Sequence, residues 1–177
     1  LLMLKATMSG SKISFFLLIF FYIPVLIEMP YIFSLWLKNV PDYAVLFCRL
    51  GLIRNLIDQL FVTLTSAIAA VGNIRKFQIY NSVLNFFPLL ISYVLFSFRF
   101  PVYYLYIVFI IYSLIGGILV LSFAKSDCEL SIPIYLKNVV MPCLVSFVLI
   151  LILSLVPFLF NLNQSLRLLF VISISSI

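Results

Sequence analysis

The sequence predicts an all-α integral membrane protein, a polytopic bundle of transmembrane helices. Its 177 residues are 66% hydrophobic and only 9% charged, and the mean hydropathy is +1.31. A soluble domain carries about 25% charged residues, so this chain has too little polar surface to coat a globule in water. Apolar runs of the length that crosses a bilayer, about 20 residues, also recur along the chain between short basic loops. Lipid is therefore the expected solvent.

The first apolar run covers residues 13–37 and is interrupted in its second half. Glu28 and Pro30 break it, because proline lacks the N–H group that a helix interior needs. We expect a crossing helix before the break and a short piece at the membrane interface after it. Tyr31 and Trp36 suit that depth, since their rings are apolar with one polar tip.

Five further helices follow from the remaining apolar runs, so the sequence predicts five crossings and the start of a sixth. The predicted ranges are 42–71, 79–98, 102–124, 139–160 and 166–177. Residues 125–138 form the most polar stretch, and we expect its second half to lie on the membrane surface. The chain opens without methionine and stops inside an apolar run. We therefore expect it to be a piece of a longer membrane protein.

The basic residues predict the orientation, because cytoplasmic loops are enriched in lysine and arginine. Alternate loops fall on opposite sides of the bilayer. One side would carry Lys5, Lys12, Arg75, Lys76, Lys125 and Lys137, and the other would carry Lys38, Arg99 and Arg167. The first set is the larger and is expected to be cytoplasmic. The net charge of +6 is thus explained by topology, and we expect no nucleic-acid partner.

Residue types that are absent from the chain limit the chemistry that it can perform. There is no histidine, which removes the commonest general base and the commonest metal ligand. Cys48, Cys128 and Cys143 form no CxxC pair and are interpreted as free structural thiols. No nucleotide or phosphate-binding loop appears. We expect no enzyme activity, no cofactor and no metal.

The predicted helix 42–71 differs from the others because it carries a stripe of polar side chains. At 100° per residue, one arc of about 140° collects most of them. These residues are Gly51, Arg54, Asn55, Asp58, Gln59, Val62, Thr65 and Ser66. The rest of the wheel is largely leucine, isoleucine and phenylalanine. The stripe must face protein or water, because lipid cannot satisfy it.

Charged residues in this stripe are candidates for function. An arginine or aspartate at the centre of a crossing helix costs roughly 2.5–3.5 kcal/mol, and Arg54 and Asp58 are spaced to pair along the helix. We expect the stripe to line a polar pathway in which Arg54 holds an anionic group. The alternative is a buried ion pair that locks two helices together. For Asn55 and Gln59 we expect hydrogen bonds between helices.

Arg49 and Glu28 lie outside this stripe. Arg49 is nearer the end of its helix, where it is either part of the binding site or reaches the interface with its long side chain. Glu28 is a candidate proton or cation site, or a gate partner for an arginine. The interpretation that we favour for Glu28 is a carboxylate at a helix break that reaches headgroup water.

Several phrases resemble the Wzx-type polysaccharide export proteins, which are lipid-linked oligosaccharide flippases of the multidrug/oligosaccharidyl-lipid/polysaccharide superfamily. The family shows a proline-broken helix ending in an L-W-L-G-like phrase, a V-P-x-Y loop, an arginine-bearing helix, an A-x-G turn with basic residues and a P-I-S-Y phrase. The matching positions here are Leu35 to Lys38, Val40 to Tyr43, Arg49 with Arg54, Ala70 to Gly72 with Arg75 and Lys76, and Pro88 to Tyr93. Lys38 stands where the family usually has glycine.

The resemblance implies that the chain is part of the second lobe of a larger two-lobed transporter in a bacterial cytoplasmic membrane. The implied substrate is an oligosaccharide on a polyprenyl pyrophosphate, moved to the outer leaflet by alternating access around a cationic cavity. The implied partners are the bilayer, this lipid-linked oligosaccharide and a coupling cation or proton. Two alternatives are a drug or metabolite exporter of the same superfamily, which would place carboxylates in its cavity, and a membrane polysaccharide polymerase or ligase, which would need long outward loops. A purely structural membrane subunit is a third.

Overall fold

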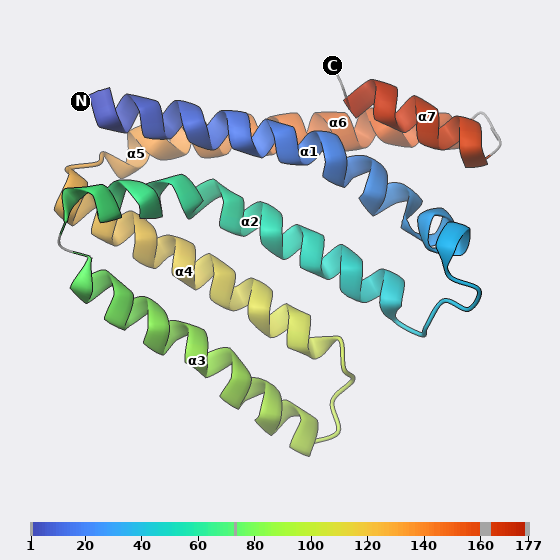
Figure 1. Ribbon diagram of the computed structural model, residues 1–177, viewed down its shortest axis with the longest axis horizontal. Coiled ribbons are helices and arrows are strands. Elements are labelled where there is room, and N and C mark those ends of the chain that lie inside the picture. Colours follow the sequence, from blue (N-terminus) through green and yellow to red (C-terminus); the bar gives the residue numbers. More distant parts are fainter. Residues whose placement is uncertain (1, 73, 160–163, 176–177) are drawn as a thin grey trace.

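The computed structural model describes residues 2–72, 74–159 and 164–175, and within these ranges the chain is helical with no strand. Figure 1 shows the helices as long, roughly parallel rods. Their bounds are α1 Leu2–Trp36, α2 Ala44–Val71, α3 Arg75–Ser97, α4 Tyr104–Cys128, α5 Ile132–Tyr135, α6 Met141–Leu159 and α7 Gln164–Ser175. A π-helical turn, Leu136–Val140, joins α5 to α6.

Consecutive long helices run in opposite directions, so their connections alternate between two ends of the bundle (Figure 1). The start of α1, the α2–α3 turn and the α4–α5 turn lie at one end, which we call the N-terminal end. The α1–α2 and α3–α4 loops lie at the other, which we call the far end. This is the alternation that the sequence predicts for the basic residues.

Among the residues that the structure describes, four helices are long and apolar enough to cross a membrane, over Met3–Leu35, Arg75–Ser97, Tyr104–Cys128 and Ile132–Val156. This confirms an all-α chain suited to multiple passes through a bilayer. The fifth long helix, α2, spans 28 residues and is absent from that set. Its polar stripe lowers the hydropathy of the helix, although its length would cover a hydrocarbon core of about 30 Å.

Four predicted helix boundaries are wrong by four residues or more. The helix predicted from residue 79 begins at Arg75, and the helix predicted to end at residue 124 continues to Cys128. The first helix begins at Leu2, not near residue 13, because nothing between these positions stops a helix. The helix predicted from residue 139 begins at Ile132 instead. Pro133 occupies its first turn, where proline costs no hydrogen bond, so the expected surface segment is the start of a helix.

The predicted break in the first helix is confirmed. Glu28 has non-helical backbone angles, φ −92° and ψ 15°, and Pro30 follows two residues later. Beyond the break the chain is helical again as far as Trp36. Figure 1 shows the resulting change of direction near the far end of α1.

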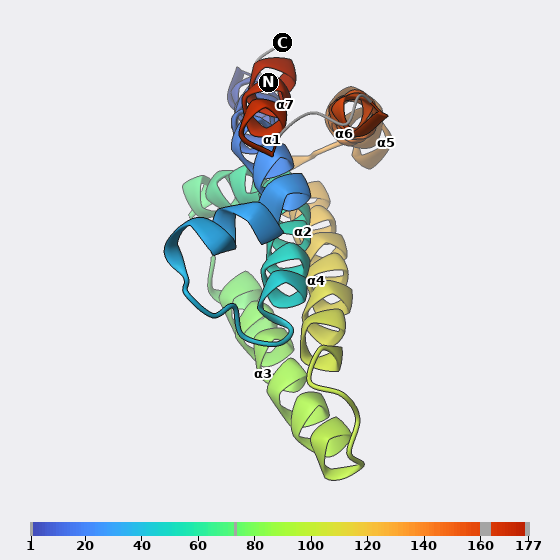
Figure 2. The same cartoon turned by 90° about the vertical axis from the view of Figure 1, so that its right-hand side faces the viewer.

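The core lies where α1 packs on α2 and α2 packs on α4. Ile19 and Ile23 of α1 and Leu64 and Ile68 of α2 are almost fully buried there. Figure 2 shows α1 above α2, with α4 and α3 beneath and α6 to one side. The second helix is thus the central element, which explains how a helix with a polar stripe can be held in an apolar bundle.

Three hydroxyl groups form a buried network near the N-terminal end. Ser11 of α1 bonds to Thr63 of α2, and it lies 3.2 Å from the hydroxyl of Tyr135. Tyr135 also donates to the backbone carbonyl of Leu60. Ser11 and Tyr135 are both fully buried, so the network satisfies hydroxyls that would otherwise be stranded among apolar side chains.

The side chain of Phe61 on α2 makes a tight contact with α4 at Gly117. The ring of Phe61 lies directly against the Gly117 backbone, so that an added Cβ would meet its Cδ2 at 2.7 Å and its Cζ at 2.8 Å. The neighbouring Gly116 is different, because a Cβ there would lie 3.8 Å from the nearest atom, Cδ2 of Leu84. The two neighbouring glycines Gly116 and Gly117 are therefore not equivalent.

Candidate functional site

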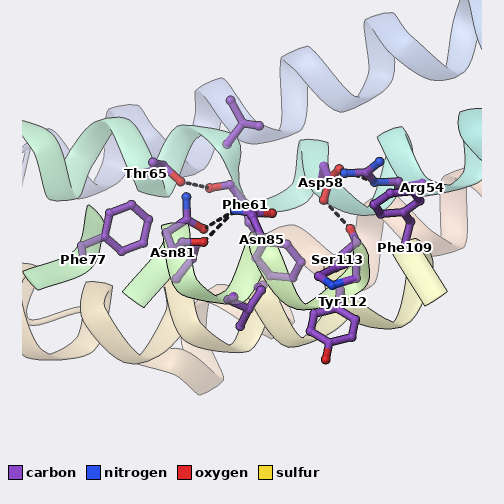
Figure 3. A pocket seen from close by; sticks show the side chains of 16 residues that line it. Arg54, Asp58, Phe61, Thr65, Phe77, Asn81, Asn85, Phe109, Tyr112 and Ser113 are labelled. Atoms are coloured by element: carbon purple, nitrogen blue, oxygen red, sulfur yellow. Dashed lines mark hydrogen bonds and ion pairs between the residues drawn. The ribbon is translucent and has the colours of Figure 1, made fainter. Parts of the chain in front are cut away.

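A polar cavity of about 260 Å³ lies between α2, α3 and α4. Figure 3 shows its polar side chains spread along the helix axes, with Arg54 and Asp58 towards one end and Asn81 and Thr65 towards the other. Arg54 lies ten positions after the first residue of α2, which is about 15 Å along the helix. The 28 residues of α2 span about 42 Å, so Arg54 lies about 5 Å from the midpoint of the helix. If α2 crosses the bilayer, the charges of this cavity lie near its centre.

Arg54 and Asp58 lie close together, as their spacing predicts. Nε of Arg54 is 3.6 Å from Oδ2 of Asp58, which is close enough for attraction but too long for a hydrogen bond. The other oxygen of Asp58 accepts a hydrogen bond from Ser113 of α4. Asp58 therefore has contacts with side chains of two helices, α2 and α4, and these contacts hold its carboxylate beside Arg54.

The guanidinium of Arg54 keeps hydrogen-bonding capacity. Its Nε is buried and, among the described residues, has no hydrogen-bond partner. The group lies over the ring of Phe109, with Cζ 4.7 Å from the ring centroid, a geometry that stabilises a cation without using its N–H groups. Arginine carries five such donors in a planar fork that matches carboxylate and phosphate oxygens. The guanidinium therefore has N–H groups that Asp58 and Phe109 do not use.

Two asparagines of α3 add neutral polar groups to the cavity. Nδ2 of Asn85 donates to the backbone oxygen of Asn81 at 2.8 Å and lies 3.2 Å from its side-chain oxygen. Both line the cavity opposite α2. Sequence reasoning missed them, although two asparagines four residues apart in an apolar helix are a visible signal. Ser113 and Phe109 gave no comparable signal.

Val62 and Thr65 of the predicted stripe also line this cavity, whereas Gly51, Asn55, Gln59 and Ser66 do not. Asn55 is exposed, and Gln59 is half-buried. Within the part of the chain that the structure describes, neither side chain makes the predicted hydrogen bond to another helix. A helical wheel shows on which face of α2 a residue lies, but it does not show where the neighbouring helices are. The cavity therefore uses only part of the predicted 140° polar arc.

Arg49 is bound to the backbone of α1 and does not line the cavity around Arg54. Its Nε donates to the carbonyl of Leu26 at 2.9 Å and its Nη2 to the carbonyl of Ile27 at 3.3 Å. Pro30 has no N–H to offer the carbonyl four residues before it, which is that of Leu26. Arg49 supplies the missing donor, and its charge also suits the negative end of the helical segment that stops here.

We expect Arg49→Ala to lower the free energy of unfolding by about 1–3 kcal/mol, the usual cost of a buried acceptor left without a donor. Pro30→Ala restores an N–H at that position, so the double variant should recover much of the loss. Unfolding of the purified protein in detergent, followed by circular dichroism, measures both. Equal losses with and without Pro30→Ala would refute this role of Arg49.

Glu28 lies at the same break and is paired with Arg167 of α7. Two contacts join them, Nε to Oε1 at 2.5 Å and Nη2 to Oε2 at 2.7 Å. Glu28 is only 1% exposed, so the favoured expectation that it reaches headgroup water is wrong. The geometry is instead the one expected of a partner for an arginine. Bidentate pairs of this kind are strong and directional.

The sequence predicted Glu28, Arg49 and Arg54 as notable residues, but the structure divides them between two places. Arg54 and Asp58 belong to the cavity, whereas Glu28 and Arg49 belong to the α1 break. Arg167 was assigned only to a loop side, and nothing in its neighbourhood indicated a partner 139 positions away. All three cysteine thiols are free. Within the described ranges, no three acidic, cysteine or histidine side chains gather as a metal site.

Comparison of the chain with protein-family models, with curated proteins and with solved structures gave no match.

Proposed function

We propose that this chain is part of a polytopic transporter in which the cavity between α2, α3 and α4 binds the anionic group of its substrate. The observation that carries the proposal is the guanidinium of Arg54. It lies in a cavity at the centre of α2, against an aromatic ring, and its buried Nε has no hydrogen-bond partner within the described ranges. Ionisable residues at such a depth are costly and usually serve transport or binding. The proposal includes α2 as a fifth crossing helix.

The proposed substrate is an oligosaccharide on a polyprenyl pyrophosphate, moved from the cytoplasmic to the outer leaflet of a bacterial inner membrane by alternating access. The resemblance to polysaccharide export proteins supports this class, and a pyrophosphate would use the free donors of Arg54. Asn81 and Asn85 offer further donors and acceptors in the same cavity. Asp58 balances the arginine when the cavity is empty, which lowers the cost of holding a cation in the membrane.

A drug exporter with a cationic substrate is the main competing function, because it would use Asp58 in place of Arg54. The two functions predict opposite sensitivities. An anionic substrate requires the charge of Arg54 and tolerates Asp58→Asn, whereas a cationic substrate requires the charge of Asp58. Our proposal fails if Asp58→Asn stops transport of the cell's own substrate and Arg54→Ala does not.

In cells producing the complete protein, we expect Arg54→Ala to reduce export about tenfold or more at an unchanged protein level. This is the effect of losing one charge-assisted hydrogen bond, about 1.5–3 kcal/mol. Export is measured as surface polysaccharide, and protein level by immunoblot of isolated membranes. Asn55→Ala is the matched control, because it changes the adjacent exposed residue and should leave export unaltered.

Exchanging the two charges, with Arg54→Asp and Asp58→Arg together, separates binding from structure. The exchange should restore the protein level if the single variants lose it, because the pair is re-formed one turn away. It should not restore export, because the cation no longer lies over Phe109. Restored export would contradict a directional anion site and support a purely structural pair.

A further inference from the structure

A second cavity, of about 440 Å³, lies on the other side of α2 from Arg54. It runs between α2 and α6 and is closed along one side by α1. Its lining includes Phe15, Leu26, Leu56, Leu60, Phe147 and Leu151. At 100° per residue, the α2 residues that line this second cavity point roughly opposite to the α2 residues that line the cavity around Arg54. We call this cavity the α2–α6 groove.

The α2–α6 groove has the chemistry of a lipid-tail site. Its described lining is leucine, isoleucine and phenylalanine, with Arg49 as the exception. Glycine, alanine, serine and threonine are absent from that described lining, although these small residues are what let a neighbouring helix approach closely in a membrane. A flexible hydrocarbon chain fills such a surface better than a rigid helix does.

Arg49 places an uncompensated positive charge at one end of this groove. The two other arginines described above have carboxylate partners, since Arg54 lies beside Asp58 and Arg167 is bound to Glu28. No such ion pair holds Arg49 among the described residues, which include every Asp and Glu of the chain. Its bonds to Leu26 and Ile27 use two of five N–H groups, so three remain for a ligand.

The depth of Arg49 matches a phospholipid headgroup. It lies eight to nine positions before the midpoint of the 28-residue helix α2, which is about 13 Å along the axis. This is close to the edge of a hydrocarbon core of about 30 Å centred on α2, at the same end as the α1–α2 loop. From there the groove extends along α2 towards Leu60, in the direction that an acyl chain takes from its headgroup into the bilayer. The charge of Arg49 and the apolar surface thus follow one another along α2 in the same order as the headgroup and the acyl chain of a phospholipid.

We propose that the α2–α6 groove binds one anionic phospholipid of the surrounding bilayer, with its phosphate on Arg49 and an acyl chain against α6. This lipid is distinct from a transported substrate, and the proposal does not rest on the function assigned to the cavity around Arg54. The phosphate oxygens take the remaining N–H groups of Arg49. The lipid therefore binds beside the break in α1.

The test uses tryptophan fluorescence and brominated lipids, which quench a tryptophan only on contact. The reporter is Phe147→Trp, with Trp36, the single tryptophan of this chain, and every tryptophan elsewhere in the complete protein replaced by Phe. The complete protein is reconstituted in vesicles of dibrominated phosphatidylglycerol or dibrominated phosphatidylcholine. We expect phosphatidylglycerol to be favoured about fivefold at this reporter, the effect of one basic residue near an anionic lipid. A reporter at Ile118→Trp, which is exposed on α4, should show a ratio near one.

Removing the charge should abolish the preference. Arg49→Ala combined with Pro30→Ala is used, so that the α1 backbone keeps a donor, and the ratio should fall to about one. Arg54→Ala should leave the ratio unchanged, which separates this proposal from the proposed transport function. Equal quenching by both lipids at Phe147→Trp, an unchanged ratio without Arg49, or no quenching by either lipid would each overturn the proposal. The last result would mean that protein fills the groove.

Discussion

Glu28→Ala is expected to destabilise the protein by about 3–5 kcal/mol, the cost of removing one partner from a buried ion pair. Glu28 is 1% exposed and meets Arg167 through two hydrogen-bonded contacts. Without the carboxylate, the charge of Arg167 loses a bidentate partner in a surrounding of low polarity. Unfolding in detergent with increasing denaturant measures the loss, and the protein level in membranes should fall with it.

The matched control is Asp42→Ala, which removes a carboxylate from the exposed α1–α2 loop and should change stability by no more than about 0.5 kcal/mol. The double variant Glu28→Leu with Arg167→Leu removes both charges. It should be considerably more stable than Glu28→Ala, because apolar pairs often replace buried ion pairs without loss. If the double variant loses as much as the sum of the two single variants, the pair does not act as a unit.

Gly117→Ala is expected to have the second largest effect, a loss of about 1–3 kcal/mol from overpacking. The added methyl group overlaps the ring of Phe61, so α2 and α4 must separate or the ring must turn. Phe61 also lines the cavity around Arg54, so this variant should reduce export beyond what its protein level explains. Thermal unfolding in detergent and the export assay measure the two effects.

Gly116→Ala provides the control one residue away, because its added carbon meets only a side-chain carbon of Leu84 at 3.8 Å. It should be neutral or slightly stabilising, since alanine is the better helix former by roughly 0.5–1 kcal/mol. Phe61→Ala should suppress the effect of Gly117→Ala, because no ring is left to overlap. Similar losses at both glycines would show that helix bending, not the contact with Phe61, explains them.

The elements of this fold were largely predictable, because each depends on local sequence. Apolar runs give the long helices, and Pro30 with Glu28 gives the break in α1. The largest errors lie where a helix begins without a clear signal, as at Leu2, or where proline at position 133 starts a helix that polar composition argued against. The local sequence preference for starting a helix is weak at such termini, so contacts made by a few neighbouring residues decide where the helix begins.

The candidate site was predictable only in part. The spacing of Arg54 and Asp58 is local, and the structure places them together as expected. The partners that come from other helices were not predictable, among them Ser113 on Asp58 and Arg167 on Glu28. Arg49 shows why, because its partners are two backbone carbonyls at the break in α1, one of which Pro30 leaves without a donor. Every residue type has a backbone carbonyl, so the sequence does not reveal this contact.

The pairing of Glu28 with Arg167 also has a consequence for biosynthesis. The two residues are 139 positions apart, and a ribosome adds about 5–20 residues per second. Glu28 therefore enters the membrane about 7–28 s before its partner is made. During that interval the carboxylate lacks its partner, so the end of α1 beyond the break cannot take its final place. Although α1 is synthesised before α7, its final placement depends on the insertion of α7.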